Sequence, residues 1–95
     1  MSEENMSNKY TSEALDALYR SILQLENVAE CYDFFEDLCT VTEIRAMAQR
    51  FQVAHMLKEG HTFQQIAAQT GASTATISRV NTCLKYGNGY KYILK

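Results

Sequence analysis

Residues 62–85 hold the side chains whose types and spacing most clearly predict a chemical task. Ala67 is small at a point where two helices would touch, and Gly71 can adopt the positive φ that a sharp helix exit requires. Ile77 and Val80 are three residues apart, so they lie on one face of the second helix. This pattern predicts a helix-turn-helix, whose second helix is left free to enter the major groove of DNA.

Both helices of this motif carry capping residues. Thr62 is followed three residues later by Gln65, which is the pattern of a capping box. Ser73 or Thr74 can cap the second helix. The outward face of that helix is small and polar and has no acid: it consists of Thr74, Ala75, Ser78, Arg79 and Thr82. We predict that this face contacts DNA, and the alternative is a helical hairpin that binds nothing.

The net charge of −2 conceals an uneven distribution of charge along the chain. All 11 acidic residues precede Gly60. Residues 60–95 carry four bases and no acid, the bases being Arg79, Lys85, Lys91 and Lys95. We interpret this as a basic end directed at phosphate and an acidic body kept away from it. Chance clustering in a short tail is the alternative.

Composition argues against several other classes of protein. No apolar run approaches the roughly 20 residues of a membrane span, the N-terminus is unlike a signal peptide, and a cytoplasmic location is expected by default. Cys31, Cys39 and Cys83 lack metal-ligand spacing, so we expect small buried thiols in a reducing compartment. His55 and His61 lie near no Cys pair, and no phosphate loop or nucleophile elbow occurs. We predict no metal, no cofactor and no enzyme activity.

An all-α fold is favoured because the chain has no proline and only four glycines. Apolar spacing predicts helices near 11–27 and 28–39. A third helix should begin at Thr40, with Glu43 completing a capping box, and should stop at Gly60. We expect 1–10 to be disordered and 11–95 to form a single domain, with dimerisation helices in 11–60, the helix-turn-helix in 62–86 and a tail in 87–95.

Three groups of apolar side chains predict where surface is buried. The third helix is expected to place one group in the core: Ile44, Met47, Phe51, Ala54 and Leu57. Phe34 lies off the stripe that contains Phe35, and large apolar residues on two faces indicate burial by a partner chain. The tail is expected to fold back on the body or to reach a partner through Tyr90, Tyr92, Ile93 and Leu94.

From Cys39 onward the chain resembles the tryptophan repressor family, and within it the Trp-repressor-like proteins of the YerC/YecD type. The segments that carry the resemblance are Thr40-Val-Thr-Glu-Ile-Arg-Ala-Met-Ala-Gln-Arg-Phe, Leu57-Lys-Glu-Gly, Gly71-Ala-Ser-Thr-Ala-Thr-Ile-Ser-Arg and Leu84-Lys85. The resemblance covers residues 12–86, and in the first half it rests on helix pattern alone. It implies an intertwined homodimer, a palindromic operator in double-stranded DNA and repression by occlusion.

The resemblance also implies individual DNA contacts. Base edges would be approached by Thr74, Ala75 and Ser78, and phosphates or bridging waters by Thr76 and Lys85. Gln64 replaces an arginine that reads a guanine in the repressors, and Ala67 replaces a lysine, so a different operator is expected. Arg79, if no ligand engages it, could contact phosphate or guanine, or could only solvate the helix surface.

A ligand pocket is implied in the same way. Arg50 matches an arginine that clamps the tryptophan ligand, and Arg79 matches one that stacks on its indole ring. Val80, however, stands where the repressors have a glycine that leaves room for the indole, and Cys83 replaces a serine. Adding a ligand here would overpack the site at a cost of about 1–3 kcal/mol, so tryptophan binding is not expected. Arg50 could then pair with an acid of the body.

The leading hypothesis is therefore a dimeric transcription regulator that binds DNA without tryptophan and whose effector, if any, is open. One alternative is a protein-interaction module that docks the transcription machinery through the helix-turn-helix and the tail. Another is a regulator gated by a different small ligand near Arg50 and Arg79. DNA binding should weaken steeply with salt, whereas docking through an apolar tail should be nearly insensitive to salt.

Overall fold

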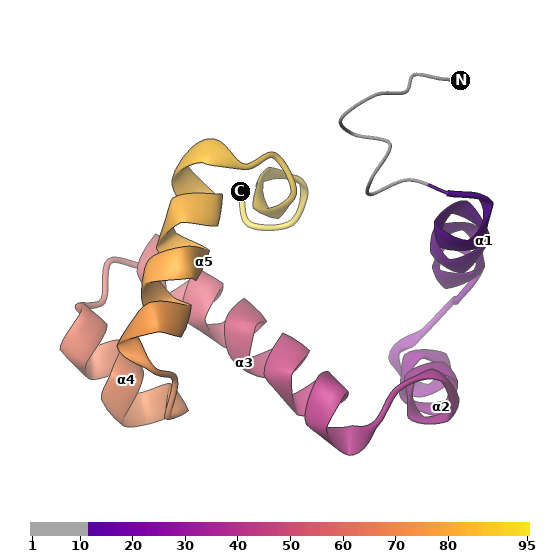
Figure 1. Cartoon of the computed structure of the whole chain (residues 1–95), viewed down its shortest axis with the longest axis horizontal. Helices are drawn as coiled ribbons and strands as arrows, with labels where there is room; N and C mark the ends of the chain where they lie inside the picture. Colours follow the sequence, from indigo (N-terminus) through magenta and orange to yellow (C-terminus); the bar gives the residue numbers. More distant parts are fainter. Residues whose placement is uncertain (1–11) are drawn as a thin grey trace. The chain divides into compact units, whose positions relative to one another are not determined.

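The computed structural model describes residues 12–95, and this part of the chain is all-α, as predicted (Figure 1). Its elements in order are α1 (Glu13–Ile22), α2 (Val28–Leu38), α3 (Val41–Lys58), α4 (Phe63–Thr70), α5 (Thr74–Tyr86) and a 3-10 helix, η2 (Tyr90–Tyr92). Two compact units are formed, of which the first ends at Leu38 and the second covers Cys39–Lys95. The predicted disorder of residues 1–10 lies outside the described residues. No helix among residues 12–95 has the length and apolar character needed to cross a bilayer.

The first unit consists of α1 and α2. The prediction that its first helix reaches residue 27 is wrong, because α1 ends at Ile22. Asn27 then caps the next helix: its side-chain oxygen accepts from the Glu30 N–H at 2.9 Å, and the Glu30 carboxylate accepts from the Glu26 N–H at 2.9 Å. The first bond satisfies one of the free N–H groups in the first turn of α2, and the second satisfies an N–H just before that helix, so both favour a new helix beginning at Val28. No side chain of α1 or α2 is buried.

The second unit is organised around α3. The predicted capping box is confirmed, since the Thr40 hydroxyl accepts from the Glu43 N–H at 3.1 Å and the Glu43 carboxylate accepts from the Thr40 N–H at 2.8 Å. The pKa of Glu43 lies below its ordinary value, mainly because the Thr40 backbone N–H donates to the carboxylate and so favours its charged form, with a smaller contribution from the Thr40 side chain. Gly60, with φ +93°, provides the left-handed exit predicted at the far end.

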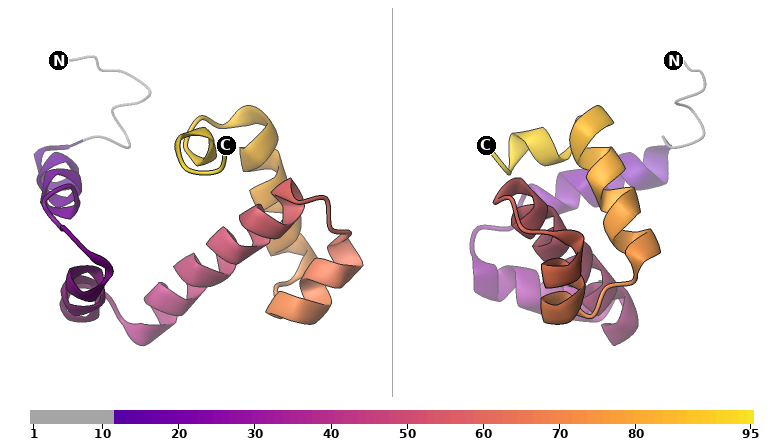
Figure 2. Two further views of the ribbon diagram at one scale, coloured as in Figure 1. Left: turned by 180° about the vertical axis from the view of Figure 1, so that it is seen from behind. Right: turned by 90° about the vertical axis from the view of Figure 1, so that its left-hand side faces the viewer.

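α3 packs against both α4 and α5 (Figure 2). The core of this unit is formed by Val53, Ala54, Met56, Ile66, Ala72, Ile77 and Val80. The buried residues of α3 are confined to its C-terminal half. The prediction that Met47 and Phe51 belong to the core is therefore wrong within a single chain, because their exposed fractions are 39% and 44%.

The C-terminal tail is ordered by two of its apolar side chains. Tyr90 and Leu94 pack against the core of the second unit. For these two residues, the first of the two predicted alternatives is correct: the tail folds back on the body. The Leu94 N–H donates to the Tyr90 carbonyl oxygen at 2.7 Å, which closes the turn. Tyr92 and Ile93 point away from the core and remain exposed.

Candidate nucleic-acid interface

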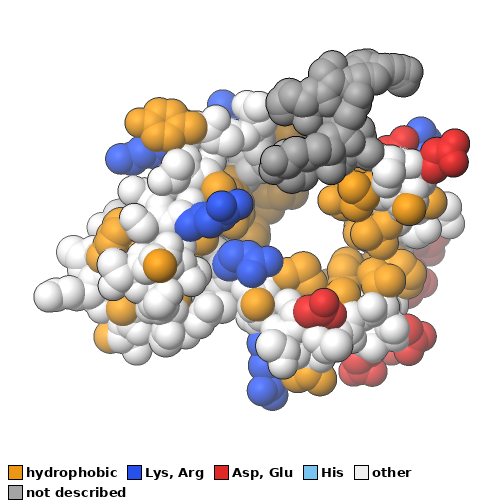
Figure 3. Space-filling model, viewed as in Figure 1, with side chains coloured by type: hydrophobic (Ala, Val, Ile, Leu, Met, Phe, Trp, Pro, Cys, Tyr) orange, Lys and Arg blue, Asp and Glu red, His pale blue; other side chains and the backbone are white. Residues whose placement is uncertain are grey.

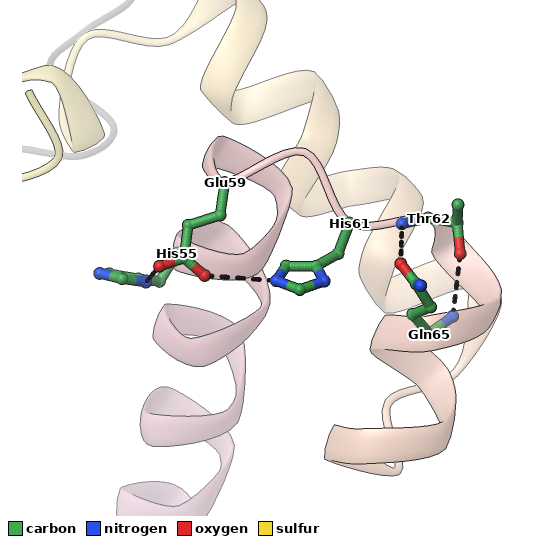
Figure 4. Close-up of polar contacts among 5 residues, drawn as sticks. All are labelled: His55, Glu59, His61, Thr62 and Gln65. Atoms are coloured by element: carbon green, nitrogen blue, oxygen red, sulfur yellow. Dashed lines mark hydrogen bonds and ion pairs between the residues drawn. The ribbon is translucent and has the colours of Figure 1, made fainter.

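Helices α4 and α5 form the predicted helix-turn-helix. The Thr62 hydroxyl accepts from the Gln65 N–H at 3.1 Å, and the Gln65 side chain accepts from the Thr62 N–H at 2.9 Å, so α4 begins with a complete capping box (Figure 4). Gly71 ends α4 in the left-handed region, with φ +74°. The Ser73 hydroxyl then accepts from the Thr76 N–H at 3.1 Å and caps α5. The predicted caps of both helices are confirmed, and the residue that caps α5 is Ser73 rather than Thr74.

Packing fixes which face of α5 is available. Ile77 and Val80 are 1% and 2% exposed, and both lie in a core to which α4 contributes Ile66. Since an α-helix turns by about 100° per residue, burying these two positions leaves the opposite side of α5 free. Ala67 packs against the core as predicted for the helix contact.

The residues predicted to contact DNA are exposed with one exception. The exposed ones are Gln64 on α4 and Thr74, Ala75, Ser78, Arg79 and Lys85 on α5. Thr76 is half-buried, and its hydroxyl accepts a hydrogen bond from the Ser73 hydroxyl at 3.1 Å. Thr74, Ser78 and Lys85 follow helical spacing and lie along one side of α5, over a length of about 16 Å at 1.5 Å per residue.

Arg79 lies beside a residue of α3. Arg79 of α5 and Arg50 of α3 line the same open hollow of about 540 Å³, together with Ala75 and Thr76. The structure thus brings together the two arginines that the resemblance assigns to a ligand pocket. Val80 and Cys83 do not line this hollow. Val80 is in the core and Cys83 is half-buried, because successive residues of a helix point in different directions.

The electrostatic environment of this surface is positive. On the face drawn in Figure 3, acidic side chains lie over α1, α2 and the start of α3. Helix α5 carries Arg79 and Lys85, and neither α4 nor α5 contains an acid. Within residues 12–95 the close contacts of acidic with basic side chains join Glu59 to His55 and His61, so neither Arg50 nor Arg79 is paired with an acid there. A guanidinium without a carboxylate partner retains its donors for phosphate or for a guanine edge.

A polar cluster lies at the junction of α3 and α4 (Figure 4). One carboxylate oxygen of Glu59 is 3.4 Å from Nδ1 of His55, and the other is 3.4 Å from Nε2 of His61. All three side chains are well exposed, and exposed pairs of this kind stabilise a fold only slightly. Across the described part of the chain, no group of three or more His, Cys, Asp or Glu side chains could hold a metal ion.

This arrangement is that of a known family. The sequence model of the Trp repressor protein family matches residues 13–95. The chain belongs to the Trp repressor family. That family consists of DNA-binding transcription regulators rather than enzymes.

Individual relatives agree with this assignment. The chain is 57% identical over 81 residues to the uncharacterized protein YerC of Bacillus subtilis (strain 168), covering 85% of this chain and 78% of YerC. It superimposes with a TM-score of 0.88, at 52% identity, on a Staphylococcus aureus protein named after the Trp repressor; the match covers 96% and 92% of the two chains. A TrpR-like protein from Eubacterium eligens ATCC 27750 gives a TM-score of 0.86 at 54% identity, with 90% of each chain covered.

Sequence patterns did not identify two features of this surface. Ala75 and Thr76 were predicted as DNA contacts only, yet they also line the hollow between Arg50 and Arg79. A bond between Gln49 and the turn of the helix-turn-helix was not foreseen. Local spacing within one helix cannot show which residue of another helix lies opposite, so nothing in the sequence alone signalled either feature.

Proposed function

We propose that this protein is a sequence-specific transcription regulator that acts as a homodimer on a palindromic operator and represses by occluding it. The outward face of α5 is the observation that carries the proposal. This face is exposed, small and polar, includes Arg79 and Lys85, and lies in a stretch that has no acid from Gly60 to Lys95. Duplex phosphates would therefore meet cations and no repelling carboxylate from this stretch.

The side chains of α5 are assigned to two kinds of DNA contact. Thr74, Ala75 and Ser78 are short, so they let the helix backbone approach base edges closely, with contacts made directly or through water. We assign phosphate or water-mediated contacts to Thr76 and Lys85 and a contact from the bracing helix to Gln64. Arg79, with its forked donors, is assigned to guanine or to a phosphate.

The homodimer is proposed from apolar side chains that each unit leaves exposed. In the first unit the exposed large side chains are Tyr19, Leu23, Val28, Tyr32 and Leu38. In the second unit, Met47 and Phe51 precede the buried part of α3, which begins at Val53. An intertwined pair, in which the N-terminal helices of each chain wrap around the other, would cover both sets and leave the helix-turn-helix unchanged.

We further propose that tryptophan is not the corepressor. Val80 fills space in the core beside the hollow, at the position where the repressors have a glycine. An indole there would have to displace a packed side chain. Isothermal titration of the protein with tryptophan should give no binding heat, and an affinity in the micromolar range would overturn this part of the proposal.

The first experiment is selection of duplex DNA from a random library at about physiological salt, using the purified full-length protein. An enriched palindrome would support a dimeric, sequence-specific regulator and would supply the operator for later tests. Weak, salt-sensitive binding to all duplexes without enrichment would contradict sequence-specific recognition by the protein alone. We assign no cofactor, and we place the regulator in the cytoplasm with its DNA.

Specific observations favour two alternatives. Tyr86 at the end of α5 and Tyr92 and Ile93 in the tail have exposed fractions of 81%, 74% and 67%, which favours docking of a protein, such as a component of the transcription machinery, at this end of the chain. The hollow between Arg50 and Arg79 favours a regulator gated by a small anionic ligand. Salt separates the first alternative from DNA binding, since each phosphate contact steepens the log-log dependence of affinity on salt by about one unit.

A further inference from the structure

A tertiary hydrogen bond ties α3 to the turn of the helix-turn-helix. The Gln49 side-chain amide donates to the carbonyl oxygen of Thr70 at 3.1 Å. Both residues are half-buried, and they are 21 positions apart in the chain. Within residues 12–95, the other hydrogen bonds of side chains join residues no more than four positions apart.

The acceptor lies at a place where α4 cannot satisfy its own backbone. Thr70 is the last residue of α4, and the last four carbonyl groups of a helix have no partner within it. The Thr70 hydroxyl also donates to the Ile66 carbonyl oxygen at 2.7 Å and accepts from the Ala72 N–H at 3.1 Å. Thr70 therefore stabilises the turn in two ways. Its hydroxyl bonds to the backbone of Ile66 and Ala72, and its carbonyl oxygen accepts from Gln49 of α3.

The position of Gln49 makes this bond relevant to DNA recognition. Arg50, the next residue of α3, lines the hollow with Arg79, and Ser73, which caps α5, follows Thr70 by three residues. α3 also carries Met47 and Phe51, which we assigned to the dimer contact. The Gln49–Thr70 bond thus joins the helix that would set the distance between protomers to the turn that aims α5.

We propose that Gln49 is a positioning residue for operator recognition. Its amide holds the turn against α3 and so sets the angle at which α5 enters the groove. This inference rests on the proposed DNA-binding function. In a dimer, a change of angle would occur in both protomers, and the two α5 helices would no longer match the spacing of a palindrome.

The test uses Gln49→Met, which keeps the length of the side chain and removes the donor, and Gln49→Glu, which keeps the shape and leaves only acceptors. Gln52→Met and Gln52→Glu are the matched controls, because Gln52 is an exposed glutamine of the same helix. Hydrogen exchange at the amides of the turn, Gly71 to Ser73, is measured first, without DNA. Loss of one net hydrogen bond predicts exchange about threefold to tenfold faster in both Gln49 variants and unchanged in both controls.

The second measurement is the ratio of affinities for the selected operator and for a random duplex. The Gln49 variants should lower this ratio by about threefold to tenfold, while the salt slope on random DNA stays as in the paired Gln52 variant. If the amides of the turn exchange equally fast in the Gln49 and Gln52 variants, the claim that the Gln49–Thr70 bond stabilises the turn is overturned. Faster exchange with an unchanged ratio would overturn the positioning role. If the wild-type protein binds no operator, the proposed function fails, and the positioning role fails with it. The hydrogen-exchange result still decides whether the Gln49–Thr70 bond stabilises the turn.

Discussion

Val80 offers a quantitative test of how the helix-turn-helix is held together. Val80→Ala removes two carbons from a side chain that is 2% exposed. At about 0.8 kcal/mol per buried carbon, the lost transfer free energy is about 1.6 kcal/mol, and incomplete collapse of the space adds about 1 kcal/mol. Alanine's better helix propensity returns about 0.5 kcal/mol. The free energy of unfolding should therefore fall by about 2 kcal/mol.

Urea denaturation followed by circular dichroism measures this loss, and a thermal scan should show a fall in Tm of about 8–16 °C. Protein concentration must be matched, because the stability of a dimer depends on it. Thr82→Ala on the exposed side of α5 is the control and should change stability by less than about 0.5 kcal/mol. If Val80→Ala costs no more than Thr82→Ala, the reasoning that Val80 locks α5 to α3 and α4 is refuted.

Three further outcomes are expected. If Arg79 contacts a base, Arg79→Ala should weaken operator binding by about 1–3 kcal/mol, measured by fluorescence anisotropy. The control is Arg45→Ala, because Arg45 is an exposed arginine of α3. An unchanged affinity would assign Arg79 to surface solvation. Phe35→Glu places an unpaired charge on the apolar stripe of α2, which we expect a partner chain to bury, so sedimentation should show loss of the dimer or of folding, and a stable monomer of wild-type helicity would count against the intertwined pair. Because the pKa of Glu43 is lowered in the folded state, its carboxylate stabilises the protein above the ordinary glutamate pKa, and this contribution is lost as pH falls through the folded value. The stability difference between wild type and Glu43→Gln should accordingly shrink on acidification, and a difference independent of pH would contradict the capping argument.

The sequence predicted those parts of the structure that depend on near neighbours in the chain. The capping boxes at Thr40 and Thr62 form as expected, because a cap needs only a hydroxyl and a Glu or Gln three residues later. The left-handed exits at Gly60 and Gly71 follow from the same local rule. The inward position of Ile77 follows from helical periodicity.

Features that depend on distant residues could not be predicted in this way. Periodicity placed Met47 and Phe51 on the face of α3 that holds Ala54, but it could not show that the side chains of α3 are buried only from Val53 onward. The resemblance grouped Val80 with Arg79 in one pocket, whereas Val80 lies in the core and Arg79 lines the hollow. The Gln49–Thr70 bond joins residues whose proximity exists only in the folded chain.

The short side chains of α5 have a consequence for how specificity would arise. A threonine, an alanine or a serine near base edges makes one weak contact at most, whereas a forked arginine contact discriminates between bases by about 1–3 kcal/mol. With Gln64 in place of an arginine on α4, the described face offers few strong direct contacts. Recognition of an operator would then depend on bridging water, on DNA shape and on exact placement of two α5 helices. Under these conditions, a bond that sets the angle of α5 contributes to specificity as much as a side chain that contacts a base.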